Sequence, residues 1–167
     1  VSAGAGFGAG LAILLFGKSA AAIQISAFAF GLLAVSAAYG MSRYARSHSV
    51  TTLVLSGVIV SALFSAGLSF LKYVADPYEQ LPAIVFWTMG SLASSSYSQA
   101  LILALALLAC GGLLLAKARE LNAFAIGEDN ARNLGIEVRR VKLVVLVSVS
   151  VLIGVAVSIG GTIAFVR

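Results

Sequence analysis

Long apolar runs separated by short polar segments make up most of the chain. Four runs contain no Lys, Arg, Asp, Glu or His: residues 23–41, 53–71, 100–116 and 143–166. A helix needs about 20 residues to cross the roughly 30 Å hydrocarbon layer of a bilayer. Each of these runs therefore predicts one membrane-spanning helix, and a fifth run, residues 2–17, predicts the end of another span.

A sixth apolar stretch, residues 81–93, has 13 residues and is too short to cross the membrane. Pro82, near its start, suits the first turn of a helix. The stretch therefore predicts a short re-entrant or interfacial helix, which enters the bilayer and returns to the same side.

The charged loops indicate the orientation of the spans. Residues 42–52 carry two Arg and no acid, and residues 117–142 carry six basic side chains, so both loops are predicted to be cytoplasmic by the positive-inside bias. Residues 72–99 carry one Lys against Asp76 and Glu79, which suits the outer side. The two basic loops share a side only if the short helix does not span, so we expect the short helix on the outer side.

The composition excludes the main classes of soluble protein. Of the 167 residues, 60% are apolar and 10% are charged, with a mean hydropathy of +1.05, against about 45–50% and about 25% in soluble domains. A domain this small leaves roughly a third of its chain surface in water, so lipid is the solvent that tolerates this sequence. The chain is an integral membrane protein rather than a soluble enzyme, a disordered segment or a disulfide-stabilised secreted domain.

The net charge of +5 does not indicate nucleic-acid binding, because the basic residues lie in the gaps between apolar runs. Cys110 is the only cysteine, which excludes a disulfide framework and a thiolate metal cluster. The sequence has no initiator Met and begins at Val1 inside an apolar run. We therefore expect residues 1–167 to be an internal fragment of a longer protein.

Small side chains recur at every fourth position of the run 53–71: Gly57, Ser61, Ser65 and Ser69. Such a stripe is typical of tight helix packing in lipid, where close backbone approach drives association. The alternative is a smooth, weakly polar wall of a translocation pathway, and the two interpretations are compatible with each other. The first run carries glycines of the same packing class: Gly4, Gly6, Gly8 and Gly10.

Side chains suited to catalysis are scattered rather than clustered. His48 stands alone in a basic loop, and Asp76 and Glu79 flank Pro77 in a segment interpreted as a solvated turn, with cation or partner binding as the alternative. The Lys-Ser pair that ends residues 12–19 fits a phosphate loop poorly, because bulky apolar residues precede it. We expect no catalytic residue, no cofactor and no metal site.

The spans also lack ionisable side chains. Proton-driven carriers, pumps and voltage sensors place such groups within the membrane. If the protein moves a solute, the energy is therefore expected to come from a partner or from the gradient of the solute.

The 26-residue loop 117–142 contains Gly127 and Gly135. Glu128 directly follows Gly127, where a helix N-terminus favours negative charge. Gly135 follows Leu134, in a position where a left-handed residue commonly ends a helix. The pattern predicts a helix, a glycine hinge and a second helix at the cytoplasmic surface, forming either a plain folded loop or a docking element for a soluble partner.

Three groups of motifs resemble a known family. Residues 53–70 are followed by Ala-Asp-Pro at 75–77 and by Phe-Trp-Thr-Met-Gly-Ser-Leu at 86–92. Ile-Gly-Glu-Asp-Asn-Ala-Arg-Asn-Leu-Gly-Ile stands at 126–136, before Val-Arg-Arg at 138–140, and Gly-Gly-Thr-Ile-Ala-Phe-Val stands at 160–166. At these spacings the chain resembles the permeases of bacterial iron–siderophore, haem and cobalamin ABC importers, the FecCD-type permeases. It departs from the family pattern at Arg167, where Gly is usual.

This resemblance implies an all-α, polytopic transmembrane helix bundle that works as a dimer, with residues 1–167 forming about half of a single permease domain. It implies a short re-entrant outer-side helix and a cytoplasmic coupling segment that seats in a groove of the ATP-hydrolysing subunit. The implied coupling residues are Gly127, Glu128, Ala131, Arg132, Leu134 and Gly135. The residues implied to line or gate the translocation pathway are Gly57, Ser61, Ser65, Trp87, Gly90 and Ser91.

The same resemblance implies a multi-pass protein of the inner (cytoplasmic) cell membrane that imports chelated iron, haem or a cobalamin-type solute. Its expected partners are an ATP-binding subunit, a second permease subunit and an extracytoplasmic substrate-binding protein. ATP hydrolysis would belong to the partner, so the chain itself is not expected to be an enzyme. The alternative is a gradient-driven carrier or channel-like protein with no ATPase partner. A purely structural scaffold is disfavoured, because it needs no re-entrant helix.

Overall fold

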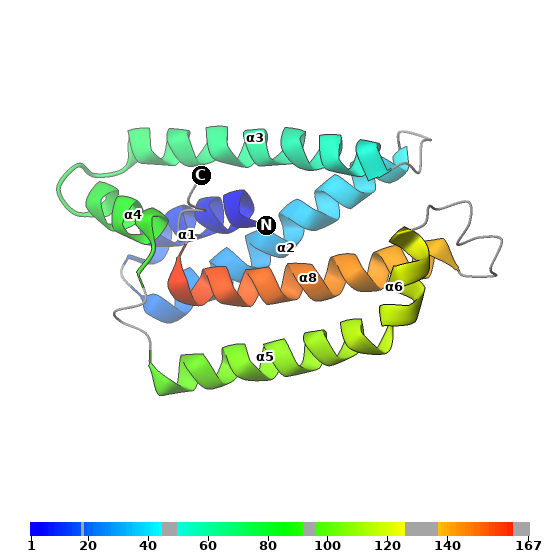
Figure 1. The fold of residues 1–167 in the computed structure, drawn as a ribbon. Helices are drawn as coiled ribbons and strands as arrows, with labels where there is room; N and C mark the ends of the chain where they lie inside the picture. The colour runs from blue at the N-terminus through cyan, green and yellow to red at the C-terminus, as the bar shows by residue number, and fades with distance from the viewer. Residues whose placement is uncertain (18, 45–49, 92–95, 126–136, 162–167) are drawn as a thin grey trace. The chain divides into compact units, whose positions relative to one another are not determined.

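The computed structural model describes residues 1–17, 19–44, 50–91, 96–125 and 137–161. Regular structure within these ranges is entirely α-helical (Figure 1). The helices are α1 (Ser2–Phe16), α2 (Ala20–Tyr44), α3 (Val50–Val74), α4 (Gln80–Met89), α5 (Tyr97–Ala116), α6 (Ala118–Ala125) and α8 (Val138–Gly160). The all-α class predicted from the sequence is confirmed.

The four predicted spans are also confirmed as helices long and apolar enough to cross a membrane: Ala20–Tyr44, Thr51–Val74, Tyr97–Ala116 and Arg140–Gly160. Most of them extend beyond the apolar runs, because helix formation continues into polar and aromatic residues at the ends. The last helix is the exception. It ends at Gly160 rather than near Val166, since Gly161 has a φ of +71° and leaves the helical conformation.

The chain divides into two compact units, described separately below. One unit comprises Val1–Ser96 with Ile153–Arg167, and the other comprises Tyr97–Leu152. The helix α8 is continuous and contributes its first part to the second unit and its last part, from Ile153, to the first.

Small residues of α1 form the centre of the first unit. Ala5 and Ala9 are fully buried with Ala27 of α2. A Cβ atom built on Gly4 would lie 2.5 Å from the carbonyl oxygen of Phe30, and one on Gly8 would overlap the carbonyl oxygen of Ser26. The two helices therefore approach backbone to backbone, as small-residue faces allow in lipid, and the packing role predicted for these two glycines is confirmed.

Aromatic rings join α3 to this helix pair. The ring of Phe7 meets Phe30 of α2 and Phe64 of α3 edge to face, with ring centroids 5.4 and 5.6 Å apart. Gly67 makes room for Phe7, since a Cβ there would lie 2.8 Å from the ring. Both ring pairs lie within the separation at which edge-to-face arrangements are favourable.

The short helix α4 packs beside α1 (Figure 1). Ile84 of α4, Ile13 of α1 and Ala75, just after α3, form one buried cluster. Ten residues of helix extend about 15 Å, half of what a span requires. The predicted short helix therefore exists, but it covers Gln80–Met89 instead of residues 81–93, because Gly90 has a φ of +73° and ends it.

The ends of α3 and α8 both lie at α4. Ala75 packs against α4, and the backbone N–H of Ser91 donates a hydrogen bond of 3.0 Å to the carbonyl oxygen of Gly160. The charge pattern predicts that both of these helix ends are on the outer side of the membrane. Their meeting at one short helix agrees with that orientation.

In the second unit, the strongly apolar α5 is followed by α6 after a single residue, Lys117. The Nζ of Lys117 lies 2.5 Å from a carboxylate oxygen of Glu120 in the first turn of α6. Glu137, just before α8, pairs with Arg140 at 3.0 Å. The first helix predicted in the loop 117–142 is thus present, whereas the predicted glycine hinge and second helix lie outside the described residues.

Candidate functional site

The predicted pathway stripe lies on an uncovered side of α3. Ser61 and Ser65 are exposed, and a Cβ atom on Gly57 would have nothing within 4 Å in the described part of the chain. The buried side of the helix runs through Ser56, Val60 and Leu71 instead. Among the described residues of the first unit, therefore, no helix covers this stripe.

Two serine hydroxyl groups of α3 donate hydrogen bonds to their own helix. Ser69 donates to the carbonyl oxygen of Ser65 at 3.0 Å, and Ser56 donates to that of Thr52 at 2.8 Å. A serine that bonds back to the preceding turn presents little polarity to its surroundings. Together with exposed Val58 and Leu63, the back-bonded Ser69 gives α3 a weakly polar surface with no charge along its middle.

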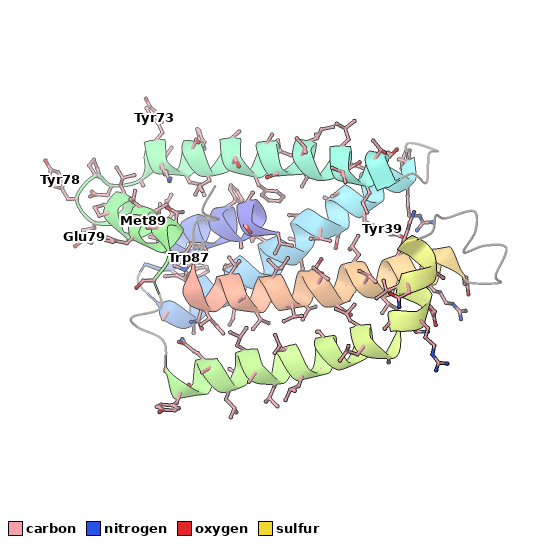
Figure 2. All side chains as sticks on the ribbon, viewed as in Figure 1. Tyr39, Tyr73, Tyr78, Glu79, Trp87 and Met89 are labelled. Atoms are coloured by element: carbon pink, nitrogen blue, oxygen red, sulfur yellow. The ribbon has the colours of Figure 1, made fainter. Side chains whose placement is uncertain are left out.

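The predicted gate residue Trp87 faces the core rather than the open side of α4. Its ring packs against the cluster of Ala5, Ala9 and Ala27 and against the cluster around Ile84. Trp87 and Met89 are both labelled on α4 in Figure 2. The tryptophan therefore anchors the short helix to α1 in this structure.

The open side of α4 consists of apolar residues that sequence reasoning did not single out. Phe86 is 74% exposed and Met89 65% exposed, and Val85 is also exposed. The helical spacing of Ile84 and Trp87 against Val85, Phe86 and Met89 could have separated the two sides. The continuous apolar run hid this difference, because both sides are apolar.

Gly90 and Ser91 meet the end of α8, and this contact was not predicted. Besides the hydrogen bond from Ser91 to Gly160, a Cβ atom on Gly161 would overlap the carbonyl oxygen of Trp87 and lie 2.9 Å from the Cα of Gly90. The two chain segments thus touch through backbone atoms. The Gly-Gly pair within the last apolar run was the available signal, since paired glycines commonly interrupt a helix.

The turn between α3 and α4 is held by Asp76. Its Oδ1 accepts hydrogen bonds from the backbone N–H groups of Tyr78 at 2.8 Å and Glu79 at 3.1 Å, and its own N–H donates to the Oε1 of Gln80 at 3.1 Å. This geometry supports the interpretation as a turn over the interpretation as a cation site. Tyr73, Tyr78 and Glu79 project outward around this turn (Figure 2).

The predicted coupling residues lie outside the described residues: Gly127, Glu128, Ala131, Arg132, Leu134 and Gly135. The structure places only the flanks of this segment, at the end of α6 and at Glu137 before α8. An ion pair joins Lys117 to Glu120 at the start of α6, and another joins Glu137 to Arg140, which suits a charged segment at an aqueous surface. The assignment of these six residues stays a prediction.

Similarity to known proteins extends over the chain. It is 35% identical over 166 residues to a molybdate import system permease protein of Haemophilus influenzae, covering 99% of this chain and 49% of the relative. It is 36% identical to a cobalamin import system permease protein of Halobacterium salinarum, covering 99% and 44%. It is 35% identical to the ferric enterobactin transport system permease protein of Escherichia coli, covering 99% and 50%.

A solved structure has the same fold. It is described as an inward-facing conformation of an ABC transporter assigned to the metal-chelate type, and it aligns with a TM-score of 0.89 and 34% identity over 99% of this chain and 52% of its own. The chain spans about half the length of the curated relatives it matches. The match to the FecCD transport family covers residues 1–167, and the chain therefore belongs to this family.

Proposed function

We propose that the chain forms about half of the membrane-spanning permease subunit of an ATP-driven importer for chelated iron, haem or cobalamin-type solutes. The family match over all 167 residues carries this proposal. The relatives named for cobalamin and ferric enterobactin support the chelate class, and the molybdate relative marks an oxyanion as the competing class. The subunit resides in the inner membrane and hydrolyses no ATP itself.

The solute passes along the uncovered side of α3, at the boundary with a second permease subunit. The exposure of Ser61 and Ser65 and the open space at Gly57 support this placement. A wall of small side chains allows a bulky solute to pass without a steric barrier. The uncharged, small side chains of this stripe also avoid tight binding, which would slow release, because conduction requires sites that a solute can leave.

The short helix α4 gates this pathway on the outer side. Its apolar residues Val85, Phe86 and Met89 are exposed, and they exclude water and ions when the gate is shut, as hydrophobic constrictions do in channels. Trp87 holds the helix to α1 from the opposite side. A substrate-binding protein docks at the outer turn beside α4, where Tyr78 and Glu79 are exposed.

The segment with Gly127, Glu128, Ala131, Arg132, Leu134 and Gly135 couples the permease to the ATP-binding subunit. Its position in the basic cytoplasmic loop 117–142 supports this role. Leu134 supplies an apolar contact at the end of the predicted second helix, and Gly135 allows the chain to turn there. Closure of the ATP-binding subunits then moves the helices on either side of the segment.

The decisive test is affinity purification of the full-length protein from gently solubilised membranes, with the co-purifying chains identified by mass spectrometry. We expect an ATP-binding subunit to co-purify. The double variant Leu134→Ala with Gly135→Ala should lose it while still inserting into the membrane. The matched control, Leu115→Ala with Gly112→Ala, makes the same chemical changes at exposed positions of α5 and should retain the ATP-binding subunit.

A stable homo-oligomer without any ATPase would contradict the importer assignment and favour a gradient-driven carrier or channel. If the ATPase co-purifies, uptake into proteoliposomes identifies the solute. Ferric siderophore, haem, cobalamin and molybdate are supplied in turn with the cognate binding protein. Uptake of molybdate alone would contradict the chelate class and leave the ATP-driven assignment in place.

A further inference from the structure

Backbone atoms of α4 and α8 come into direct contact where both helices end. The N–H of Ser91 donates to the carbonyl oxygen of Gly160 at 3.0 Å. Gly161 lies so close to Trp87 and Gly90 that a Cβ atom has no room there. Contacts of this kind need glycine on one side, and here Gly90 and Gly161 both have positive φ values, of +73° and +71°.

The hydrogen bond also satisfies a group that a helix end leaves unpaired. The last four carbonyl groups of an α-helix lack intrahelical partners, and within a bilayer an unpaired carbonyl is strongly unfavourable. The carbonyl of Gly160 obtains its partner from the end of α4. Separating the two segments would expose both the carbonyl of Gly160 and the N–H of Ser91, so the contact resists opening.

Side chains before this contact fix the end of α8 in the same unit. Val157 packs against the Ala5–Ala9–Ala27 cluster, which Trp87 of α4 also contacts. A Cβ atom on Gly154 would lie 3.1 Å from the ring of Phe28. The last two turns of α8 and the end of α4 therefore share one packed environment.

The other end of α8 begins at Val138, directly after the predicted coupling segment. The helix is continuous from there to Gly160, and its 23 residues extend about 35 Å. A helix is stiff along its axis, so a displacement at Val138 reaches Gly160. At that end, Gly160 and Gly161 contact the C-terminal end of α4.

We propose that Gly160 and Gly161 are positioning residues for α4, and that α8 links the cytoplasmic coupling segment to the outer gate through their contact with Gly90 and Ser91. This inference rests on the proposed function, which supplies the ATP-driven movement and the gating role of α4. It adds the connection between them. Neither Gly160 nor Gly161 touches the transported solute in this scheme.

The test follows the exposure of α4 in the full-length permease assembled with its ATP-binding subunit in nanodiscs. Met89→Cys serves as the reporter, in a background where Cys110 is Ser and no other cysteine remains. Labelling by a membrane-impermeant maleimide is timed with and without ATP. Typical coupling free energies correspond to changes of about fivefold or more, and we expect ATP to change the labelling rate by at least that factor.

Two variants break the contact in different ways. Gly161→Ala introduces the overlapping Cβ atom, and Ser91→Pro removes the N–H donor without adding an atom at Gly161. In both, the ratio of labelling rates should fall to about one while ATP hydrolysis continues, since coupling free energy between two sites vanishes when the ratio is one. Gly40→Ala, at an open position of α2, should keep the full response. If the Gly161→Ala variant does not assemble with the ATP-binding subunit, the labelling ratio of the Ser91→Pro variant tests the proposal.

A response that persists in either assembled variant would overturn the inference while leaving the proposed function intact. An ATP-hydrolysing, transporting complex whose reporter never responds to ATP would do the same. Failure of the protein to assemble with any ATP-binding subunit would overturn the proposed function and the inference together.

Discussion

Glycine residues in this chain differ in what surrounds them. Gly4 and Gly8 face the backbone of α2, where an added methyl group would collide with carbonyl oxygens. Gly40 and Gly112 face open space in the described part of the chain. In lipid, helices gain little from apolar burial against one another, so close packing carries much of their association. Substitutions of Gly4 or Gly8 should therefore lower the stability of the protein, and substitutions of Gly40 or Gly112 should not lower it.

Gly8→Ala should lower the free energy of unfolding of the full-length protein by about 1–3 kcal/mol, the usual effect of overpacking a well-packed site. Denaturation by SDS in mixed micelles measures this change. Gly40→Ala is the control, and it should be neutral or stabilising by up to about 1 kcal/mol through helix propensity. Equal effects of the two substitutions would contradict the close approach of α1 and α2.

At the scale of secondary-structure elements, α4 is held at both ends by polar backbone contacts. Asp76 organises the turn before it, and the bond from Ser91 to Gly160 follows its end. Ile84 and Trp87 fix its inner side between these contacts. A helix this short is marginal in isolation, so its order depends on such external contacts.

Asp76→Ala should destabilise the start of α4 by about 0.5–2 kcal/mol, as loss of a side-chain acceptor at a helix start commonly does. Hydrogen exchange measured by mass spectrometry should show faster exchange at the amides of Tyr78 and Glu79. Asp76→Asn keeps an acceptor oxygen and should retain most of the protection. If the Asn variant exchanges as fast as the Ala variant, the carboxylate charge matters more than the turn geometry.

At the scale of the whole molecule, one side of α3 is left uncovered by the other described residues of its unit. The stripe of Gly57, Ser61 and Ser65 is open here, and in the proposed function a second subunit and the solute meet it. A bulky residue on this stripe should therefore spare the folding of the chain and impair transport. The same residue on another exposed side of α3 should leave both folding and transport unchanged.

Ser65→Trp is expected to insert normally and to lower uptake by about tenfold or more, equivalent to a barrier raised by about 1.4 kcal/mol. Uptake into proteoliposomes, normalised to the amount of inserted protein, measures the effect. Leu63→Trp is the control, since Leu63 is exposed on a different side of the same helix. Equal uptake by the two variants would contradict the pathway role of the stripe.

The spans were predictable from sequence because bilayer thickness sets the length of an apolar run. The ends of the helices were harder to predict from the sequence. The run that continues to Val166 contains the break at Gly161, and the run that continues to residue 93 contains the break at Gly90, because hydropathy does not register a positive φ. The inward position of Trp87 and the meeting of Ser91 with Gly160 depend on contacts between distant segments, and the local spacing and the Gly-Gly pair do not identify the partner segment.

The contact between Ser91 and Gly160 also bears on which changes in sequence the protein can accept. A hydrogen bond between main-chain atoms does not by itself depend on which side chains the two residues carry. Every residue except proline supplies the backbone N–H that position 91 donates, so the hydrogen bond to Gly160 does not itself specify Ser. Position 161 is different, because the Cβ atom of any other residue would occupy the space of the Trp87 carbonyl. The two sides of this contact should thus differ in the sequence they require: the donated N–H at position 91 is common to nearly all residues, whereas position 161, next to the acceptor Gly160, is closed to every residue but glycine.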